Sequence, residues 1–300
     1  MEACPAHQDV PGYVELIRNR RYEKALELIR KTNCLPGVLG RACVAFCEAH
    51  CVRNDIDSPI AIRALKRVPA DYEIASGSEP KLEKREDGKE KVAVIGAGPA
   101  GLAASYNLAL KGYRVTIYDD QPSAGGMALV GIPQYRLPRD ILSRETEIIK
   151  NLGVEIKPNT RVGRDITLDS LAGEGFRAIF IATGDHLSTK SESENWKEGY
   201  EGLVDGVEFL RDVNMGREVE PKDKVIIVGG GNVAVDCART CLRLGFKEVT
   251  IVYRRSRAEM PGRKEEVEEA EREGVKIHFL AVPVRVLNEG DRVVGAECIR

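Results

Sequence analysis

The sequence of 300 residues predicts an α/β fold with two Rossmann-like dinucleotide-binding domains, preceded by a small all-α domain. Three observations predict this arrangement. The pattern Gly-X-Gly-X-X-Gly/Ala occurs twice, each time after a short apolar run and before a helical pattern. Five of the eight cysteines fall within the first 51 residues, in a segment with helical periodicity. A charged stretch with few apolar residues separates that segment from the first glycine pattern.

The first dinucleotide-binding unit begins with the apolar run Val-Ala-Val-Ile, which is typical of a buried strand. Gly96, Gly98 and Gly101 form the turn, and an Ala- and Leu-rich helix follows. Glycines let the backbone approach a pyrophosphate, and the N–H groups of the helix N-terminus favour that anion. A second strand ends at Asp119, where an acid accepts hydrogen bonds from ribose hydroxyls. The alternative, a glycine turn without a ligand, does not explain the acid.

The second glycine pattern contains Gly229, Gly231 and Ala234 between a strand and a helix. The next strand ends in Arg254 and Arg255 where an NAD site has a carboxylate. Two arginines there suit the 2′-phosphate of NADP. The alternative is an ordinary solvated basic turn. Cys237 and Cys241 lie one turn apart on the helix, and we expect them to be core residues.

Two dinucleotide folds in one chain imply two dinucleotides. FAD in the first and NADPH in the second is the economical pairing, because hydride transfer from nicotinamide to flavin requires both in one protein. A strand that ends in Ala-Thr-Gly, at residues 182–184, closes the flavin half.

The N-terminal cysteines suggest a metal site. Cys43, Cys47 and Cys51 are spaced by four residues, and Cys4 precedes a proline, as the last cysteine of many iron–sulfur runs does. A zinc site is one alternative. Another is an apolar stripe, since on one regular helix the three spaced cysteines would share a face.

The predicted domain organisation follows from these patterns. Helical spacing extends from Tyr13 to Asn33 and ends at Pro36, and a further helix is expected with Ser58 as its cap and Pro59 at its first position. The predicted boundaries are a helical iron–sulfur domain at 1–75, a linker at 76–90, an FAD domain at 91–190, a connection at 191–221, and an NADPH domain at 222–300.

Composition excludes several classes of protein. Lysine plus arginine total 45 and aspartate plus glutamate 47, and the net charge of −2 excludes a generally basic nucleic-acid binder. Aromatic residues make up 5%, too few for base-stacking platforms. The uncharged stretch from Val92 to Leu110 contains three glycines and a proline, so we expect no transmembrane segment. The N-terminus lacks a secretory pattern, so we expect a cytoplasmic protein.

The motifs together are more specific than either glycine turn. The chain resembles the small (beta) subunit of NADPH-dependent glutamate synthase and its relatives, including the flavin half of dihydropyrimidine dehydrogenase and the large subunit of NADH-dependent ferredoxin–NADP oxidoreductase. The stretches with this resemblance are ACPAHQDVPGYV, GRACVAFCEAHC, SPIAIRALKR, GAGPAGLAAS, GGMALVGIPQYRLP, IFIATG, GGGNVAVD and VYRRSRAEMPG.

The resemblance implies a role for each matched position. The expected FAD-binding residues are Gly96, Gly98, Pro99, Ala100, Gly101, Asp119, Gly126, Met127, Arg136 and Val162. The expected NADPH-binding residues are Gly231, Asn232, Val233, Arg254 and Arg255. The expected ligands of a [4Fe–4S] cluster are Cys4, Cys43, Cys47 and Cys51.

The chain departs from the family pattern at both ends. Well-known members bind two clusters and have three more cysteines upstream of the Cys-Pro pair, and Cys51 then belongs to the other cluster. The position of a non-cysteine ligand falls near Lys66, whose ammonium cannot ligate, so we expect one cluster on all four cysteines. The family's C-terminal return segment, with its second FAD contact, has no counterpart here, so we expect a fragment of a longer polypeptide.

The resemblance implies a flavin-dependent oxidoreductase that passes electrons from NADPH through FAD and a [4Fe–4S] cluster to an electron-accepting subunit or domain. The protein then provides geometry and electrostatics, and no side chain is nominated as catalytic. The alternatives are a non-catalytic nucleotide-binding scaffold, an electron-transfer module of a larger complex, and NADP reduction from ferredoxin. A disulfide reductase would require a cysteine pair between Gly125 and Gly184, and none is present.

Overall fold

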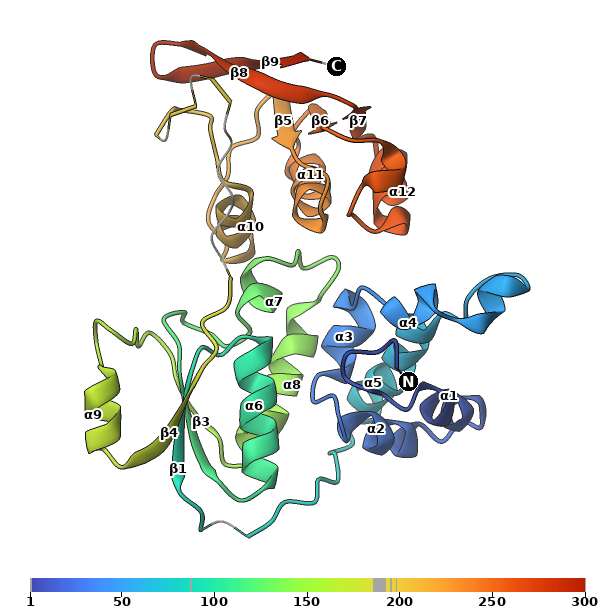
Figure 1. The fold of residues 1–300 in the computed structure, drawn as a ribbon, viewed down its shortest axis with the longest axis vertical. Coiled ribbons are helices and arrows are strands. Elements are labelled where there is room, and N and C mark those ends of the chain that lie inside the picture. The colour runs from blue at the N-terminus through green and yellow to red at the C-terminus, as the bar shows by residue number, and fades with distance from the viewer. Residues whose placement is uncertain (1, 87, 186–192, 195, 198, 300) are drawn as a thin grey trace. The chain divides into compact units, whose positions relative to one another are not determined.

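The computed structural model describes residues 2–86, 88–185, 193–194, 196–197 and 199–299. The chain forms two compact units. Unit 1 comprises Met1–Leu129 and Gln134–Asp185, and unit 2 comprises Val130–Pro133 and His186–Arg300. Each unit has its own parallel sheet (Figure 1).

The N-terminal part of unit 1 is helical, as predicted. Its elements are α1 (Val10–Arg18), α2 (Tyr22–Arg30), α3 (Pro36–Ala42), α4 (Phe46–Ala49), a 3₁₀ turn (Val52–Asp55) and α5 (Ile62–Ser76). Their shared core contains Tyr13, Ile17, Ala25, Ile29 and Ile62, which come from α1, α2 and α5. These apolar side chains recur at helical spacing, so each helix buries one face in this core.

Three details predicted for this part were wrong. Pro36 begins α3 instead of ending a helix, and the run from Tyr13 is broken at 19–21 into α1 and α2. The helix predicted from Ser58 begins at Ile62. Its early N–H at Arg63 donates to the Glu48 carboxylate at 2.7 Å, so a residue remote in sequence caps this helix.

The remainder of unit 1 is a parallel sheet with helices. The elements are β1 (Lys91–Ile95), α6 (Pro99–Leu110), β2 (Arg114–Tyr118), α7 (Met127–Val130, which extends into unit 2), α8 (Arg139–Asn151), β3 (Glu155–Lys157), α9 (Leu168–Gly173) and β4 (Phe176–Ile181). The strand order is β3-β2-β1-β4 with parallel pairs, which is the order at the start of a doubly wound sheet. Helix α8 contacts both α6 and α3, so it lies between the sheet layer and the helical part (Figure 1).

Unit 2 also contains a parallel sheet with helices. Its elements are α10 (Gly206–Asn214), β5 (Lys224–Val228), α11 (Asn232–Leu244), β6 (Glu248–Tyr253), a 3₁₀ turn (Arg257–Glu259), α12 (Lys264–Glu273), β7 (Lys276–Phe279), β8 (Val282–Glu289) and β9 (Arg292–Ile299). Strands β5, β6 and β7 form a parallel sheet, and β8 and β9 an antiparallel hairpin. Cys241 lies in a core shared by α11, β6 and α12, and Cys237 is also buried, so both are core residues as predicted.

Candidate functional site

The first glycine turn lies between β1 and α6 and is packed too tightly for side chains. A Cβ added at Gly96 would lie 2.2 Å from the Ala182 carbonyl oxygen, and one at Gly101 would lie 1.8 Å from the Gly96 carbonyl oxygen. Helix α6 begins with Gly98 as its N-cap and Pro99 at its first turn, and no side chain caps it. Its first N–H groups are therefore available to an anion at this end of the sheet.

Asp119 directly follows β2 and reaches the same turn. Its carboxylate accepts hydrogen bonds from the N–H of Ala97 at 2.5 Å and of Gln121 at 2.8 Å. A carboxylate has about four acceptor positions, so lone pairs are left for ribose hydroxyls. The structure thus brings the predicted acid and the predicted glycines together.

Gly126 lies against Gly98, although 28 positions separate them in the sequence. A Cβ at Gly126 would lie 2.7 Å from the Cα of Gly98, and Gly126 has a φ of +50°. Met127, the next residue, begins α7. The Gly125 N–H donates to the Ala97 carbonyl at 2.9 Å, which fixes this loop beside the turn.

Three other residues predicted to contact FAD have surroundings that differ from those of the glycines and Asp119. Ala100 is exposed in the first turn of α6, and Arg136 is half-buried in the turn before α8. Val162 packs beside Tyr118 and Phe176 on the sheet core and forms a bridge with Ile166.

The second glycine turn joins β5 to α11 and has Gly231 as the helix N-cap, again without a side-chain cap. A Cβ at Gly230 would lie 2.5 Å from the Tyr253 ring. The Asn232 Oδ1 accepts from the Arg263 N–H at 3.1 Å, and Val233 is exposed beside it. The predicted phosphate-binding residues are therefore held at one helix N-terminus.

Arg254 and Arg255 directly follow β6, at the position of Asp119 in the first unit. Both are exposed, and neither side chain makes a hydrogen bond or ion pair within the described ranges. The bonds around Arg255 are made by the backbone, where its carbonyl accepts from the Leu280 N–H at 3.1 Å. Two exposed guanidinium groups that make no hydrogen bond to a carboxylate in the described ranges are available to a phosphate.

Three of the four predicted cluster ligands lie near one another. Burial raises the pKa of the Tyr13 phenol, and Cys47, Cys4 and Cys43 raise it further, so all three thiols are within electrostatic reach of one hydroxyl. Cys4 lies in a turn in which its carbonyl accepts from the His7 N–H at 2.8 Å.

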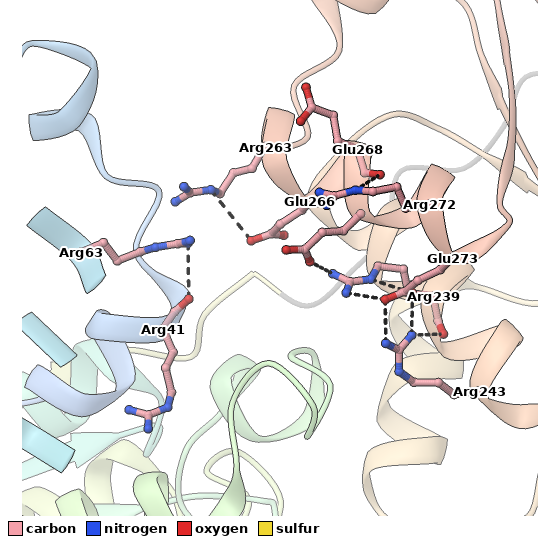
Figure 2. A network of polar contacts seen from close by, with 10 residues as sticks. Arg41, Arg63, Arg239, Arg243, Arg263, Glu266, Glu268, Arg272 and Glu273 are labelled. Carbon is pink, nitrogen blue, oxygen red and sulfur yellow. Dashed lines mark hydrogen bonds and ion pairs between the residues drawn. The ribbon is translucent and has the colours of Figure 1, made fainter. Parts of the chain in front are cut away.

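The backbone around Cys43 is held in place by Arg63. The Arg63 guanidinium donates to the carbonyls of Arg41 at 3.4 Å and Cys43 at 3.3 Å, and Figure 2 shows the first of these bonds. The Cys43 sulfur accepts from the Ala45 N–H at 3.3 Å, and Ala45 has a φ of +60°. The loop between α3 and α4 thus presents the Cys43 sulfur as an acceptor.

The cysteines do not share one helix, so the interpretation as a helical stripe was wrong. Cys43 ends α3, Cys47 lies in α4, and Cys51 follows α4. Cys51 is not among the groups that act on Tyr13 or Cys47. Within the described ranges, no three His, Cys, Asp or Glu side chains are arranged to hold a single metal ion, so zinc gains no support.

A cluster of four irons fits the residues around these thiols better than one ion does. Each cysteine of a [4Fe–4S] cluster binds its own iron, so its ligands are spread more widely than those of one metal ion. Lys66 on α5 is 5% exposed and close enough to Cys47 to lower the pKa of that thiol, which burial raises. Its ammonium has no hydrogen bond or ion pair within the described residues. A buried cation beside thiols fits a negatively charged cluster.

This fold and these sites define a dinucleotide-binding oxidoreductase with an N-terminal iron–sulfur domain. Comparison with known families is more specific. Residues 90–298 match the pyridine nucleotide-disulphide oxidoreductase family, and the chain belongs to it. Residues 1–78 match the family described as dihydropyrimidine dehydrogenase domain II, 4Fe-4S cluster. The two families confirm the predicted fold class and the expected cofactors, FAD, NADPH and a [4Fe–4S] cluster.

Individual relatives agree with this membership. The chain is 49% identical over 322 residues to the NADP(+)-dependent formate dehydrogenase subunit beta of Moorella thermoacetica, covering all of this chain and 45% of that protein. It is 35% identical over 312 residues to the glutamate synthase [NADPH] small chain of Escherichia coli, covering 99% of this chain and 65% of that one. The second match confirms the resemblance. The chain spans less than two thirds of either relative.

A solved structure shows the same fold. Mycobacterium tuberculosis FprA in complex with NADPH matches with a TM-score of 0.58 and 16% identity, covering 70% of this chain and 67% of that chain. In the described parts of this chain, every helix is too short or too polar to cross a bilayer.

Sequence reasoning missed two residues of the cysteine site. Tyr13 was visible only as part of an apolar helical pattern, and no local pattern shows that its hydroxyl is buried near three cysteines. Lys66 was noted as a non-ligand, but its burial depends on the packing of α5 against α1 and α4. For both residues, the role becomes visible only in the tertiary structure.

Proposed function

We propose that this chain is the electron-input module of a larger oxidoreductase, taking electrons from NADPH and delivering them to a partner subunit or domain. The observation that most supports this proposal is that two of the candidate sites lie in unit 1. The cysteine site and the first glycine turn belong to one compact unit. The Glu145 carboxylate of α8 joins them by accepting from the N–H groups of Gly37 at 2.5 Å and Val38 at 3.0 Å, at the start of α3. Such a joint suits electron transfer, which requires fixed distances between centres.

When bound, FAD would accept a hydride from NADPH and release its two electrons singly to the cluster. The chain's own residues bind and orient these groups. The N–H groups at the start of α6 would bind the pyrophosphate, and the Asp119 carboxylate would accept hydrogen bonds from the ribose hydroxyls. By the resemblance, Gly126, Met127, Arg136 and Val162 lie along the rest of FAD.

In unit 2 the start of α11 binds the NADPH phosphates through Gly231, Asn232 and Val233. Arg254 and Arg255 bind the 2′-phosphate, which distinguishes NADPH from NADH. Cys4, Cys43, Cys47 and Cys51 bind the cluster. The eight cysteines of the chain form no disulfide, and together with this chemistry that favours a reducing, cytoplasmic location.

The partner is an electron-accepting subunit or domain. The relatives are named as a beta subunit and a small chain, which are names of components in multi-subunit enzymes. A formate dehydrogenase component and a glutamate synthase large subunit are therefore the classes of acceptor to test first.

The test is an anaerobic absorbance titration of the chain, with its cluster reconstituted and FAD supplied, against NADPH and NADH. We expect NADPH to bleach the flavin bands at lower concentration than NADH. Replacing both Arg254 and Arg255 by alanine should weaken NADPH binding about 10- to 100-fold and leave NADH binding nearly unchanged, because the two exposed charge-assisted contacts together contribute about 1.5–3 kcal/mol. The control is Arg217→Ala, an exposed arginine paired with Asp212 on α10. An equal response of the unmodified chain to both coenzymes would contradict the NADPH assignment.

A further inference from the structure

Tyr13 has a buried polar group that the fold itself does not satisfy. Its side chain is 0% exposed, and its hydroxyl has no hydrogen-bond partner among the described residues. The ring packs with Ile17, Ile29 and Ile62 in the helical core, and Cys47 packs against the same cluster. An unpaired buried hydroxyl costs about 1–3 kcal/mol, so its retention calls for an explanation.

The surroundings of this hydroxyl are rich in sulfur. After burial, the groups that raise the pKa of Tyr13 are Cys47, Cys4, Cys43 and the carboxylate of Glu48. A phenol is an O–H donor at neutral pH, and Cys47 packs against the same core as the Tyr13 ring, so the hydroxyl is available as a hydrogen-bond donor beside the cysteines. Its acceptors would be sulfur atoms, which accept hydrogen bonds in iron–sulfur proteins.

Lys66 has the complementary property. It is 5% exposed on α5, which packs against α4 where Cys47 lies, and it has no carboxylate partner in the described part of the chain. The carboxylate of Glu48, the residue after Cys47, accepts instead from the backbone N–H of Arg63 at 2.7 Å. The ammonium is thus left for the thiolates and whatever they bind.

We propose that Tyr13 and Lys66 set the reduction potential of the iron–sulfur cluster, Tyr13 by donating a hydrogen bond from its hydroxyl to a sulfur of the cluster or its ligands, and Lys66 by placing a positive charge beside Cys47. The inference rests on the proposed cluster site. Reduction adds one negative charge, and both a donor and a cation stabilise the more negative state. Both residues therefore raise the potential and make the cluster a better acceptor for flavin electrons. They are positioning residues and do not ligate iron.

The test is a redox titration of the reconstituted chain, followed by electron paramagnetic resonance (EPR) of the reduced cluster. Tyr13→Phe removes only the hydroxyl. We expect it to shift the one-electron equilibrium toward the oxidised cluster by about threefold to tenfold, where tenfold corresponds to 59 mV. The matched control is Tyr22→Phe, because the Tyr22 ring packs against the same core and contacts the tilted Tyr72 ring at 4.9 Å between ring centroids. Tyr22 is not among the neighbours of the cysteines, so the control should leave the potential unchanged.

A second variant and a second measurement keep the test decisive. Lys66→Met keeps the length of the side chain and removes its charge, and we expect a shift in the same direction as for Tyr13→Phe. In the unmodified chain, electron–nuclear double resonance should show a proton coupled to the reduced cluster that exchanges in D₂O and disappears in Tyr13→Phe. Because the Ala45 N–H also donates to the Cys43 sulfur, only an exchangeable proton that is lost in Tyr13→Phe is assigned to the Tyr13 hydroxyl.

The outcomes separate the two proposals. A cluster signal with unchanged potentials in both variants, or the same exchangeable coupled protons in Tyr13→Phe as in the unmodified chain, would overturn this inference and leave the proposed function intact. Failure of the unmodified chain to assemble any cluster would overturn both. Lower potentials in both variants, with Tyr22→Phe unchanged, would support the inference.

Discussion

Gly126 shows how a single residue shapes the candidate FAD site. It has a φ of +50°, and its Cα approaches Gly98 so closely that a Cβ would lie 2.7 Å from the Gly98 Cα. A side chain there must push the loop away from the start of α6, where the pyrophosphate would bind. The adjacent Gly125 keeps Gly126 in this position, because the Gly125 N–H donates to the Ala97 carbonyl.

We therefore expect Gly126→Ala to lower the FAD content of the reconstituted chain at least tenfold. The strain at positive φ and the contact with Gly98 add, at about 1 kcal/mol or more each. The measurement is the ratio of flavin to protein absorbance after gel filtration. Gly173→Ala is the matched control, because Gly173 lies in α9 with nothing within 4 Å of an added Cβ. If both variants retain flavin equally, the predicted site is wrong.

At the scale of elements, the sequence determined which elements form but not where some of them begin. The strand–turn–helix units at 91–110 and 224–244 were predictable, because their apolar strands and glycine turns are local signals. The starts of α3 and α5 were not. The first N–H groups of α3 are capped by Glu145 and those of α5 by Glu48, both distant in sequence. Ser58 and Pro59 have the local pattern of a helix start, but in the folded chain α5 begins at Ile62.

The pair α11–α12 is held together by a charged network that the sequence also did not reveal. Figure 2 shows Glu273 of α12 between Arg239 and Arg243 of α11, with distances of 2.8 Å to each. Arg239 also pairs with Glu269 at 2.9 Å, and its side chain is largely buried. The arginines, Arg243 first, lower the pKa of Glu273 to about 2.

Glu273→Gln should therefore destabilise unit 2 by about 1–2 kcal/mol at pH 7, the range for bonds to charged groups that are partly exposed. Because the pKa of Glu273 is lowered on folding, its stabilisation is present above about pH 4.5 and is lost as the pH falls toward 2. Thermal unfolding at pH 7 and pH 4 measures this, and the difference from the unmodified chain should be smaller at pH 4. Glu271→Gln is the control, since Glu271 pairs with the exposed Arg257. Equal losses in both variants would contradict the role of the network.

At the scale of the whole molecule, the candidate site was predictable in its parts but not in its assembly. The glycines, Asp119 and the two arginines follow local patterns that come from the geometry of nucleotide binding. Tyr13, Lys66 and Glu145 do not, because their importance depends on which segments the fold brings together. Glu145 is the clearest instance, since nothing in the sequence around α8 indicates that it caps a helix 108 positions earlier.

Glu145 also makes the joint between the helical part and the sheet of unit 1 sensitive to pH. It is 3% exposed, and burial raises its pKa to about 7, although the two N–H groups of α3 and Arg30 act in the opposite direction. Beside it, Arg30 and Glu73 form a buried two-bond ion pair at 2.6 Å, and the negative charge of Glu73 disfavours a second carboxylate. The native state therefore binds the Glu145 proton more tightly than the unfolded chain does.

A raised pKa in the folded state contributes stability that is fully present below about pH 4.5 and is lost as the pH rises through about 7. Glu145→Gln keeps an acceptor for the α3 N–H groups but cannot ionise. We expect the free energy of unfolding of the unmodified chain to fall relative to this variant between pH 5 and pH 8, by at most about 1.4 kcal/mol per pH unit. Urea unfolding followed by circular dichroism at several pH values measures the difference, and all other titrations cancel between the two proteins. Glu147→Gln is the control on the same helix, because Glu147 is exposed and pairs with Lys150. Parallel curves for the unmodified chain and Glu145→Gln would show that the joint does not titrate, and the helical part would then be held to the sheet by an ionised carboxylate throughout this range.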